Sequence, residues 1–287
     1  MKPIPFFSVT IVTYNSLASL RRAVDSIFEQ TDPDWELIVV DNHSTDGTGR
    51  YLEQIADPRV RFFSIRNDGI VAKSRNVSFA HSRGRYVAIL DADDYWFPTK
   101  LRECRLVLEK NPELIGVCHA ELYESGGRRW PVRHGPYPAD LTAHLFKKGG
   151  CLSPSASVFK LEAYRTVGGF SEDPGIATAE DYDAWFKLSR TGVVAYLSEC
   201  LGVFVLHENN TSYKQGHCAP ILAGWKVYHR HFIIEMKRRS LSGREVVLSA
   251  FYLRRFFRSF VSYVMNFCKW RIKAYWDFRV VRESSCA

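Results

Sequence analysis

The sequence lacks several patterns that would indicate a particular class of protein. It contains no Cys-x-x-Cys pair, and its seven cysteines are scattered and odd in number, so neither a zinc module nor a disulfide framework is expected. No run of about 18 uncharged apolar residues occurs, which predicts no membrane-spanning helix. The N-terminus lacks the charged and small-residue segments of a signal peptide. These absences favour buried or incidental thiols in a reducing compartment, with the cytoplasm as the expected location.

Common phosphate-binding and calcium-binding loops are also missing. Gly-Lys-Ser/Thr does not occur, which excludes a Walker A loop, and the Gly-x-Gly stretch at Gly47 lacks the third glycine of a dinucleotide-binding loop. The acidic stretch that begins at Asp91 has Trp96 and Arg102 where a calcium EF-hand loop needs Gly and Glu. The chain also shows no internal repeat and no low-complexity segment.

The 287 residues, of which 46% are hydrophobic, suit one large α/β domain or a domain with an appendage. Apolar runs predict strands at 7–13, 36–40, 60–65 and 86–90, and helical periodicity predicts helices at 17–28, 49–55 and 70–80 between them. This alternation predicts a mostly parallel sheet flanked by helices.

The pattern is looser after residue 112. It predicts strands at 116–123, 155–159 and 203–206, a loop at 126–150 and a helix at 178–189. In that helix Thr178 is the expected N-cap and Asp181 the third helical residue. We expect a catalytic domain at 1–215, divided into halves at 1–98 and 99–215, and a helical basic extension at 216–287.

Polar residues follow each of the first four predicted strands. Thr13 and Tyr14 follow the first strand, Asp41 the second, Arg66-Asn67 the third and Asp91 the fourth. Since ligands bind beyond the carboxyl ends of parallel strands, four separate segments are expected to meet at one binding rim.

Asp91 and Asp93 are the strongest candidates for binding a metal. In an extended segment residues i and i+2 point the same way, so the two carboxylates form an oxygen-rich cluster suited to Mg²⁺ or Mn²⁺. A solvated acidic turn is the alternative. Asp94 is expected to brace the loop by accepting backbone hydrogen bonds.

Three further residues have two interpretations each. Asp41 can accept hydrogen bonds from a nucleobase or ribose, or it can stabilise its own turn. Tyr14 can stack on a base or pack in the core. Arg75 can hold a diphosphate bidentately, or it can neutralise Asp91.

Several segments together resemble the inverting GT-A glycosyltransferases of family 2. They are SVTIVTYN, ELIVVDNHSTDGT, AKSRNVSFAHSRGRYVAILDADDYW, VGGFSE, AEDYDAW and HENNTS, which follow the family's order over residues 6–213. The resemblance implies a GT-A fold, a nucleotide-sugar donor that is usually a UDP-sugar, and a divalent metal.

The resemblance also implies a role for each site residue. The segment of Thr13 and Tyr14 and the base-contacting Asp41 would bind the nucleotide, with Arg75 near it. Asp93 would be the direct metal ligand and Asp91 would lie nearer the ribose, and Tyr95 and Trp96 are expected to wall the sugar pocket.

The general base would be Asp181 of the Glu180-Asp181 pair, and His207 would approach the metal or the diphosphate. An acid at a helix N-terminus is also favoured by the helix dipole, so a purely structural Asp181 is the alternative. The chain departs from the family in Lys73-Ser74 before Arg75, and in Val205-Leu206 before His207.

The net charge of +8 comes from the C-terminal region, because the residues before 222 carry slightly more acidic than basic side chains. If 245–273 is one helix, its basic residues share an arc of about 100° opposite an aromatic band. The basic residues are Arg254, Arg255, Arg258, Lys269 and Lys273, and the aromatic ones are Tyr252, Phe256, Phe260, Tyr263, Phe267 and Trp270. This predicts a membrane-surface helix, with packing on the catalytic domain as the alternative. No nucleic-acid partner is expected, since no binding motif accompanies the aromatic band.

By analogy with the family, the acceptor is expected to be a saccharide, linked to polyprenyl diphosphate at the inner face of the cell membrane, in surface polysaccharide biosynthesis. Two alternatives remain. A sugar-phosphate nucleotidyltransferase would want a Gly-rich basic loop where Thr13, Tyr14 and Asn15 stand. A non-catalytic sugar-nucleotide or membrane-binding module would not need the set Asp91, Asp93 and Asp181.

Overall fold

The computed structural model describes residues 3–149, 152–208, 210 and 219–239, together with 261 and 265. Its first part alternates strand and helix as predicted, with each boundary within two residues of the expected one. The elements are β1 (Phe7–Thr13), α1 (Leu17–Phe28), β2 (Trp35–Asp41), α2 (Thr48–Glu53), β3 (Val60–Ser64), α3 (Val71–His81) and β4 (Tyr86–Ile89).

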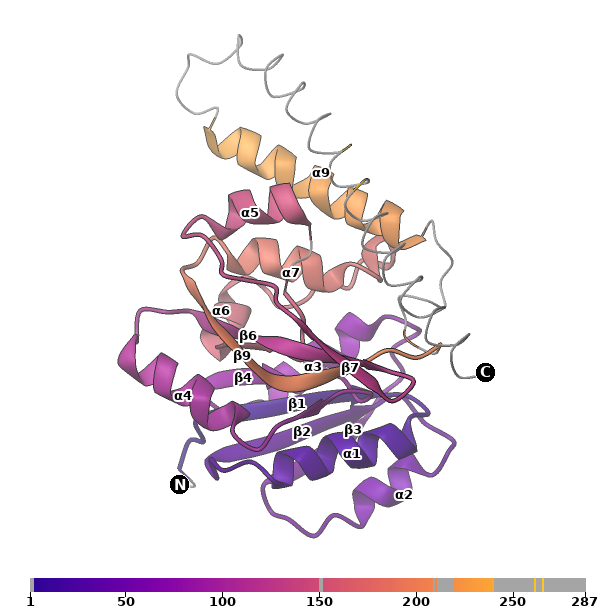
Figure 1. Cartoon of the computed structure of the whole chain (residues 1–287). Helices are drawn as coiled ribbons and strands as arrows, with labels where there is room; N and C mark the ends of the chain where they lie inside the picture. Colours follow the sequence, from indigo (N-terminus) through magenta and orange to yellow (C-terminus); the bar gives the residue numbers. More distant parts are fainter. Residues whose placement is uncertain are drawn as a thin grey trace, which may run out of the picture.

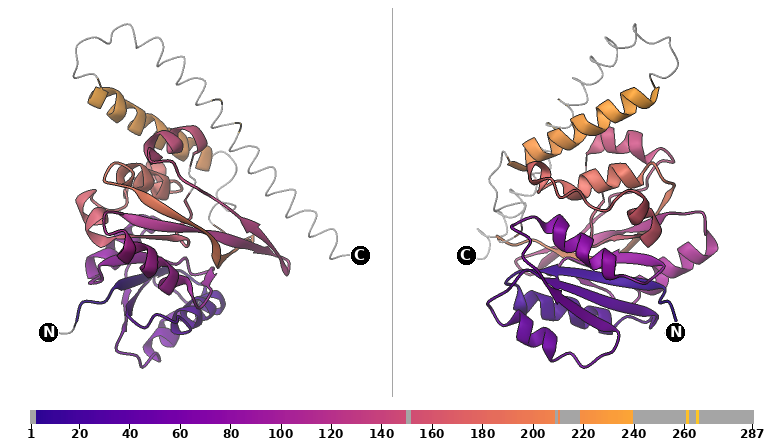
Figure 2. Two further views of the ribbon diagram at one scale, coloured as in Figure 1. Left: turned by 60° about the vertical axis from the view of Figure 1, so that its left-hand side comes forward. Right: turned by 180° about the vertical axis from the view of Figure 1, so that it is seen from behind.

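These four strands form a parallel sheet in the order β3-β2-β1-β4, which confirms the predicted parallel core. All seven residues of β2 are buried, as expected for a strand covered on both faces. α1 and α2 cover one face of the sheet and α3 the other (Figure 1; Figure 2, right). Because the strands are parallel, Thr13, Asp41 and the residues after β4 reach the same edge.

The second half adds strands of both directions to this sheet. Its elements are β5 (Tyr95–Trp96), α4 (Lys100–Lys110), β6 (Gly116–Ser125), β7 (Arg128–Val132), α5 (Leu141–Lys148), β8 (Ser157–Lys160), α6 (Leu161–Thr166), η1 (Pro174–Ile176), α7 (Glu180–Leu188) and β9 (Val194–Val205). β8 pairs antiparallel with β4, and β6, β9 and β5 follow in that order. The sheet is therefore continuous from the first half into the second half, within a mixed α/β fold.

Three features of this half differ from the sequence predictions. The segment 126–150, predicted as a loop, contains β7 and α5, and α4 occupies a stretch for which no element was predicted. β9 starts at Val194 rather than at residue 203. Its middle is polar and partly exposed, so it has no apolar run to mark it. β7 begins with the exposed residues Arg128 and Arg129, so it also lacks the apolar run by which a strand is recognised in the sequence.

The helix α9 (Ala219–Arg239) lies against α7 and η1, at the end of the molecule farthest from α1 and α2 (Figure 1). A buried pair joins it to α7: His231 Nε2 lies 2.9 Å from Asp183 Oδ1, and both residues are almost fully buried. Arg190 donates to His231 Nδ1 at 2.8 Å, so Nε2 carries the proton that Asp183 accepts.

Among the described residues no helix is long and apolar enough to cross a membrane. The basic helix predicted at 245–273 lies outside the described residues, apart from Val261 and Met265.

The His231–Asp183 contact gives a prediction for stability. Burial lowers the pKa of His231. Burial alone would raise the pKa of Asp183, but the hydrogen bond from His231 and the charge of Lys187 outweigh it and lower that pKa. Both groups therefore stabilise the fold above their unfolded-state pKa values and lose this contribution as the pH falls. His231→Ala is expected to reduce the free energy of unfolding by about 1–3 kcal/mol at pH 7, because it removes a buried donor of Asp183, which keeps its contacts with Lys187 and Arg230.

Urea denaturation at pH 7 and pH 5 measures this effect. The exposed neighbour His229 provides the control, and His229→Ala should change stability little. In His231→Ala the loss of stability between the two pH values should be smaller than in the wild type. Equal destabilisation by the two substitutions would contradict the role of the buried pair.

Candidate active site

The loop after β4 brings three carboxylates to the carboxyl edge of the sheet. The side chains of Asp91 and Asp93 are 25% and 29% exposed, whereas Asp94 is fully buried. Asp94 Oδ1 accepts a hydrogen bond from the Val205 backbone at 2.9 Å, as expected for a residue that braces the loop. Burial, reinforced by repulsion from the other two aspartates, raises the pKa of Asp94 well above its usual range. Asp91 and Asp93 thus remain accessible, and Asp94 is structural.

Arg75 links this loop to α7. It is almost fully buried, and it contacts Asp91 Oδ1 at 3.0 Å through one guanidinium nitrogen and Glu180 Oε1 at 2.8 Å through another. Burial alone would lower the pKa of Arg75, but the charges of Asp91, Glu180 and Asp181 outweigh it and raise that pKa. Of the two interpretations, neutralisation of Asp91 is the contact that the structure shows. Binding of a diphosphate remains a prediction.

The Glu180-Asp181 pair begins α7 and faces the Arg75 guanidinium. Burial raises the pKa of Glu180 to about 7. It also raises the pKa of Asp181, against the opposing charge of Arg75. Asp181 is less buried than Glu180, and its carboxylate accepts only a backbone hydrogen bond from Tyr182 among the contacts seen, at 2.7 Å. Such a carboxylate suits proton transfer, since a raised pKa improves a general base.

One detail of this helix was predicted wrongly. Thr178 is not the N-cap: α7 starts at Glu180 with Ala179 as its N-cap, so Asp181 is the second helical residue rather than the third. The cap residue contributes no side-chain hydrogen bond. The acidic first turn still places negative charge at the helix N-terminus, where the dipole favours it.

His207 approaches Asp93, although the sequence around it departs most from the family. Its Nε2 lies 3.0 Å from Asp93 Oδ2, and Asn210 donates to the same oxygen at 3.0 Å. Asn210 Oδ1 also accepts from the His207 backbone at 2.7 Å, which holds the turn after β9. Asn210 was not predicted as a site residue; its only signal was its place in the segment HENNTS.

The residues expected near the nucleotide lie at the ends of β1 and β2. The Asp41 carboxylate accepts hydrogen bonds from the backbone and hydroxyl of Ser44, so it stabilises its own turn. Thr13 is buried beside it, and its hydroxyl has no hydrogen-bond partner within the described part of the chain. Tyr14 is 58% exposed, which excludes core packing and leaves its ring accessible at the rim. Nucleotide contacts of these three residues remain predictions.

Trp96 was expected to wall the sugar pocket, and this prediction is wrong. The side chain is only 2% exposed and packs in the core that α1 and α4 share. Tyr95 is half-buried, and its hydroxyl donates to Glu124 at 2.9 Å. The strand β5 alternates its side chains, so a partly exposed Tyr95 leaves Trp96 pointing inward.

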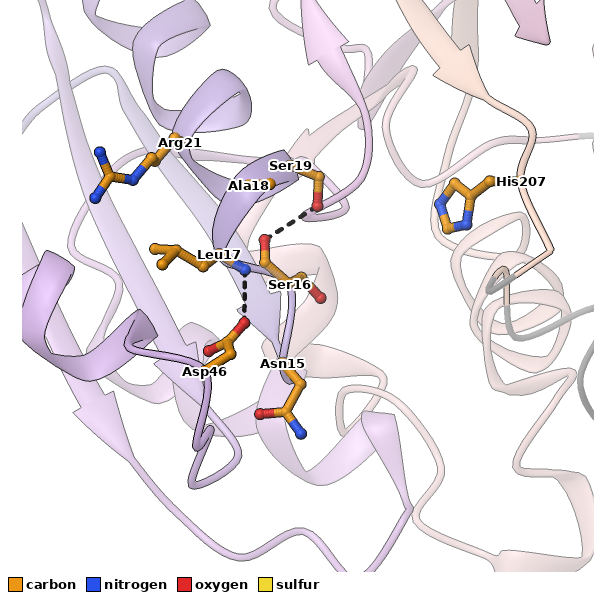
Figure 3. A pocket seen from close by; sticks show the side chains of 8 residues that line it. All are labelled: Asn15, Ser16, Leu17, Ala18, Ser19, Arg21, Asp46 and His207. Carbon is orange, nitrogen blue, oxygen red and sulfur yellow. Dashed lines mark hydrogen bonds between the residues drawn. The ribbon is translucent and has the colours of Figure 1, made fainter. Parts of the chain in front are cut away.

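A pocket of about 640 Å³ opens between the first turn of α1 and His207. Figure 3 shows Ser16 and Ser19 on one side of it, and His207 across from them. Asp46 contributes to its wall and accepts a hydrogen bond from the Leu17 backbone at 2.8 Å. Of the predicted site residues, His207 lines the pocket, and through its contact with Asp93 the pocket adjoins the carboxylate loop.

The geometry near Asp93 is suited to a divalent cation. Asp93 Oδ2 and His207 Nε2 lie 3.0 Å apart, a hydrogen-bond distance that brings two groups able to ligate Mg²⁺ or Mn²⁺ side by side. No cluster of three or more His, Cys, Asp or Glu side chains with metal-ligand spacing occurs in the described part of the chain. A metal here would therefore take its other ligands from water and a diphosphate, as Mg²⁺ sites commonly do.

Taken together, the sheet and its rim define a GT-A glycosyltransferase fold. The structure of S. aureus TarS 1-349 in complex with UDP-GlcNAc matches this chain with a TM-score of 0.67 at 21% identity, over 79% of this chain and 65% of that one. The Pyrobaculum calidifontis mannosyltransferase in complex with GDP-Man and Mn²⁺ matches with a TM-score of 0.55 at 20% identity, over 96% and 88% of the two chains.

Sequence comparison gives the family. The model of glycosyl transferase family 2 matches residues 8–168, and the chain belongs to this family. A putative teichuronic acid biosynthesis glycosyltransferase of Bacillus subtilis, TuaG, is 30% identical over 78% of this chain and 87% of its own length. Chondroitin synthase of Escherichia coli is 31% identical over 75% of this chain, which spans only 31% of that protein. The glucosyltransferase WfgD of Escherichia coli, named for UDP-Glc and α-D-GlcNAc-diphosphoundecaprenol, is 30% identical over 36% of this chain and 42% of its own.

Proposed function

We propose that this glycosyltransferase is an inverting, metal-dependent enzyme that moves a sugar from a UDP-sugar to a saccharide acceptor. The observation that supports this most strongly is the contact of Arg75 with both Asp91 and Glu180. Through Arg75, the loop of Asp91 is joined to Glu180, the residue next to Asp181, which supports a shared site for donor and acceptor. The UDP-GlcNAc complex of TarS supports the choice of donor.

The chemistry follows from this placement. The acceptor hydroxyl loses its proton to an Asp181 carboxylate oxygen while its oxygen bonds to the anomeric carbon. The bond from that carbon to the diphosphate oxygen breaks in the same step, so one displacement inverts the anomeric centre. Asp93 and His207 would hold Mg²⁺ or Mn²⁺, which neutralises charge on the departing diphosphate. The mannosyltransferase complex with Mn²⁺ supports the metal.

A donor screen tests the proposal. We expect a UDP-sugar with Mn²⁺ to raise the melting temperature and to be hydrolysed slowly without acceptor, whereas neither component alone should do so. Release of diphosphate from a nucleoside triphosphate and a sugar phosphate would instead indicate a nucleotidyltransferase. Binding of the donor with no turnover toward any acceptor would indicate a non-catalytic module.

The acceptor that we propose is a saccharide on polyprenyl diphosphate, used in surface polysaccharide synthesis. The names of TuaG and WfgD support this choice. The enzyme would then work in the cytoplasm, peripherally bound to the inner face of the cell membrane. The basic charge after residue 222 and the predicted basic helix at 245–273 support contact with anionic lipid.

A liposome experiment tests membrane contact. Deletion of residues 241–287 is expected to abolish cosedimentation with vesicles that contain anionic lipid. Binding of the full chain should weaken steeply as salt is raised, because the attraction is electrostatic. Equal sedimentation of the full and shortened proteins would show that the extension does not bind the membrane.

A further inference from the structure

A serine outside the segments that resemble the family contacts the aspartate loop after β4. Ser155 lies just before β8 and is 2% exposed. Its hydroxyl donates to Asp94 Oδ2 at 2.6 Å and accepts from the Asp91 backbone at 3.1 Å. One buried hydroxyl thus contacts the first and last residues of Asp91-Ala92-Asp93-Asp94, the turn that carries both candidate ligands.

The Ser155 backbone is also fixed. Its carbonyl accepts from Trp96 Nε1 at 2.8 Å. The Lys100 ammonium lies 3.2 Å from the centre of the Trp96 ring, and both side chains are buried. Among the described residues Lys100 Nζ has no hydrogen-bond partner, so the face of the Trp96 ring is the contact that the structure gives this nitrogen. This also explains why Trp96 points into the core rather than toward a sugar.

Asp94 extends the connection to β9. Its other oxygen, Oδ1, accepts from the Val205 backbone at 2.9 Å, two residues before His207. His207 in turn lies against Asp93 at 3.0 Å. Ser155 and Asp94 therefore connect the start of β8, the loop after β4 and the end of β9. These connections fix the position of Asp93 relative to His207.

We propose that Ser155 and Asp94 are positioning residues, which hold Asp93 and His207 at the spacing that a divalent cation and a diphosphate require. This inference rests on the proposed function, because that function gives Asp93 and His207 their ligand. Neither residue touches the donor; they act by orienting the groups that do. Supporting residues of this kind commonly change metal affinity about 10- to 100-fold.

The test compares Ser155→Ala with Ser157→Ala. Ser157 is a buried serine of the same segment, and its hydroxyl donates to Ser153 O at 2.6 Å without contacting the loop. Mn²⁺ affinity is measured in the presence of UDP by electron paramagnetic resonance. Amide hydrogen exchange of residues 90–96 and 203–208 is measured without ligand. Asp94→Asn is the second variant, since it retains an oxygen for the Val205 amide but not the charge.

We expect Ser155→Ala to weaken Mn²⁺ binding about 10-fold or more and to speed exchange in both segments. Asp94→Asn should shift both readouts in the same direction, whereas Ser157→Ala should match the wild type. If Ser155→Ala has wild-type Mn²⁺ affinity and exchange, the positioning role is refuted while the proposed function stands. If the wild type itself does not bind Mn²⁺ with UDP, both are refuted.

Discussion

Asp181→Asn is expected to lower kcat by about 10²- to 10⁴-fold while leaving donor binding unchanged. The substitution keeps the size of the side chain and its contact with the Tyr182 backbone, but removes the group that takes the acceptor proton. Asp181 has no direct contact with Asp91 or Asp93 among the hydrogen bonds and ion pairs of the described residues. Affinity for UDP, measured by calorimetry with Mn²⁺, should therefore be retained.

The pH profile sharpens this prediction. Burial raises the pKa of Asp181 above its ordinary 3.8, so kcat/KM should fall as the pH falls through this raised value and Asp181 takes up a proton. Donor affinity should not follow the same curve. In Asp181→Asn the residual rate should lose this acidic limb.

Glu180→Gln is the matched control, because Glu180 stands next in sequence and its carboxylate is occupied by Arg75. Gln retains an oxygen that can accept from Arg75, so transfer should remain measurable, with a modest loss. If Glu180→Gln is as inactive as Asp181→Asn, the pair acts as a unit and Asp181 cannot be singled out. Near-normal turnover in Asp181→Asn would refute its role as base.

Burial explains which features could be predicted from the sequence. The strands β1, β2 and β4 are covered on both faces, so each appears as an unbroken apolar run and was located to within a residue. β9 has a polar, partly exposed middle, so only its apolar last residues were recognised. The carboxyl-edge rule correctly predicted that the candidate residues reach one edge of the sheet, because it depends on the parallel strands alone.

Contacts between distant segments could not be predicted in the same way. Ser155 is uncharged and belongs to no motif, so the sequence gives no sign of its role. Its contact with the aspartate loop forms only when β8 pairs with β4. Trp96 was misplaced for a related reason: an aromatic residue after an acidic loop suits a sugar pocket and a core equally well. The buried Lys100 and the hydrogen bond to Ser155 decide between these environments.

These contacts also explain how three aspartates can lie close together at the end of one strand. Each carboxylate has a different compensation: Arg75 for Asp91, His207 and Asn210 for Asp93, and Ser155 with the Val205 amide for Asp94. Asp93 and Asp94 both lack a partner with a fixed positive charge, but Asp94 is fully buried whereas the Asp93 side chain is 29% exposed. Asp93 is therefore the member of the cluster best placed to gain from a bound cation.

Asp93→Ala is accordingly expected to abolish both activity and its dependence on metal. Loss of the direct ligand should reduce kcat/KM about a thousandfold or more, since metal stabilisation of the departing charge is worth several kcal/mol and each 1.4 kcal/mol is tenfold in rate. Asp68→Ala is the control, because Asp68 is an exposed carboxylate on the same edge that pairs with Lys73 at 2.7 Å. Mn²⁺ titrations of rate and of UDP affinity measure both effects. His207→Ala should lie between the two, with weaker Mn²⁺ binding but a measurable maximal rate, because it removes one of two ligands and leaves the carboxylate. An Asp93→Ala enzyme that remains active and still responds to Mn²⁺ would show that the cation binds elsewhere.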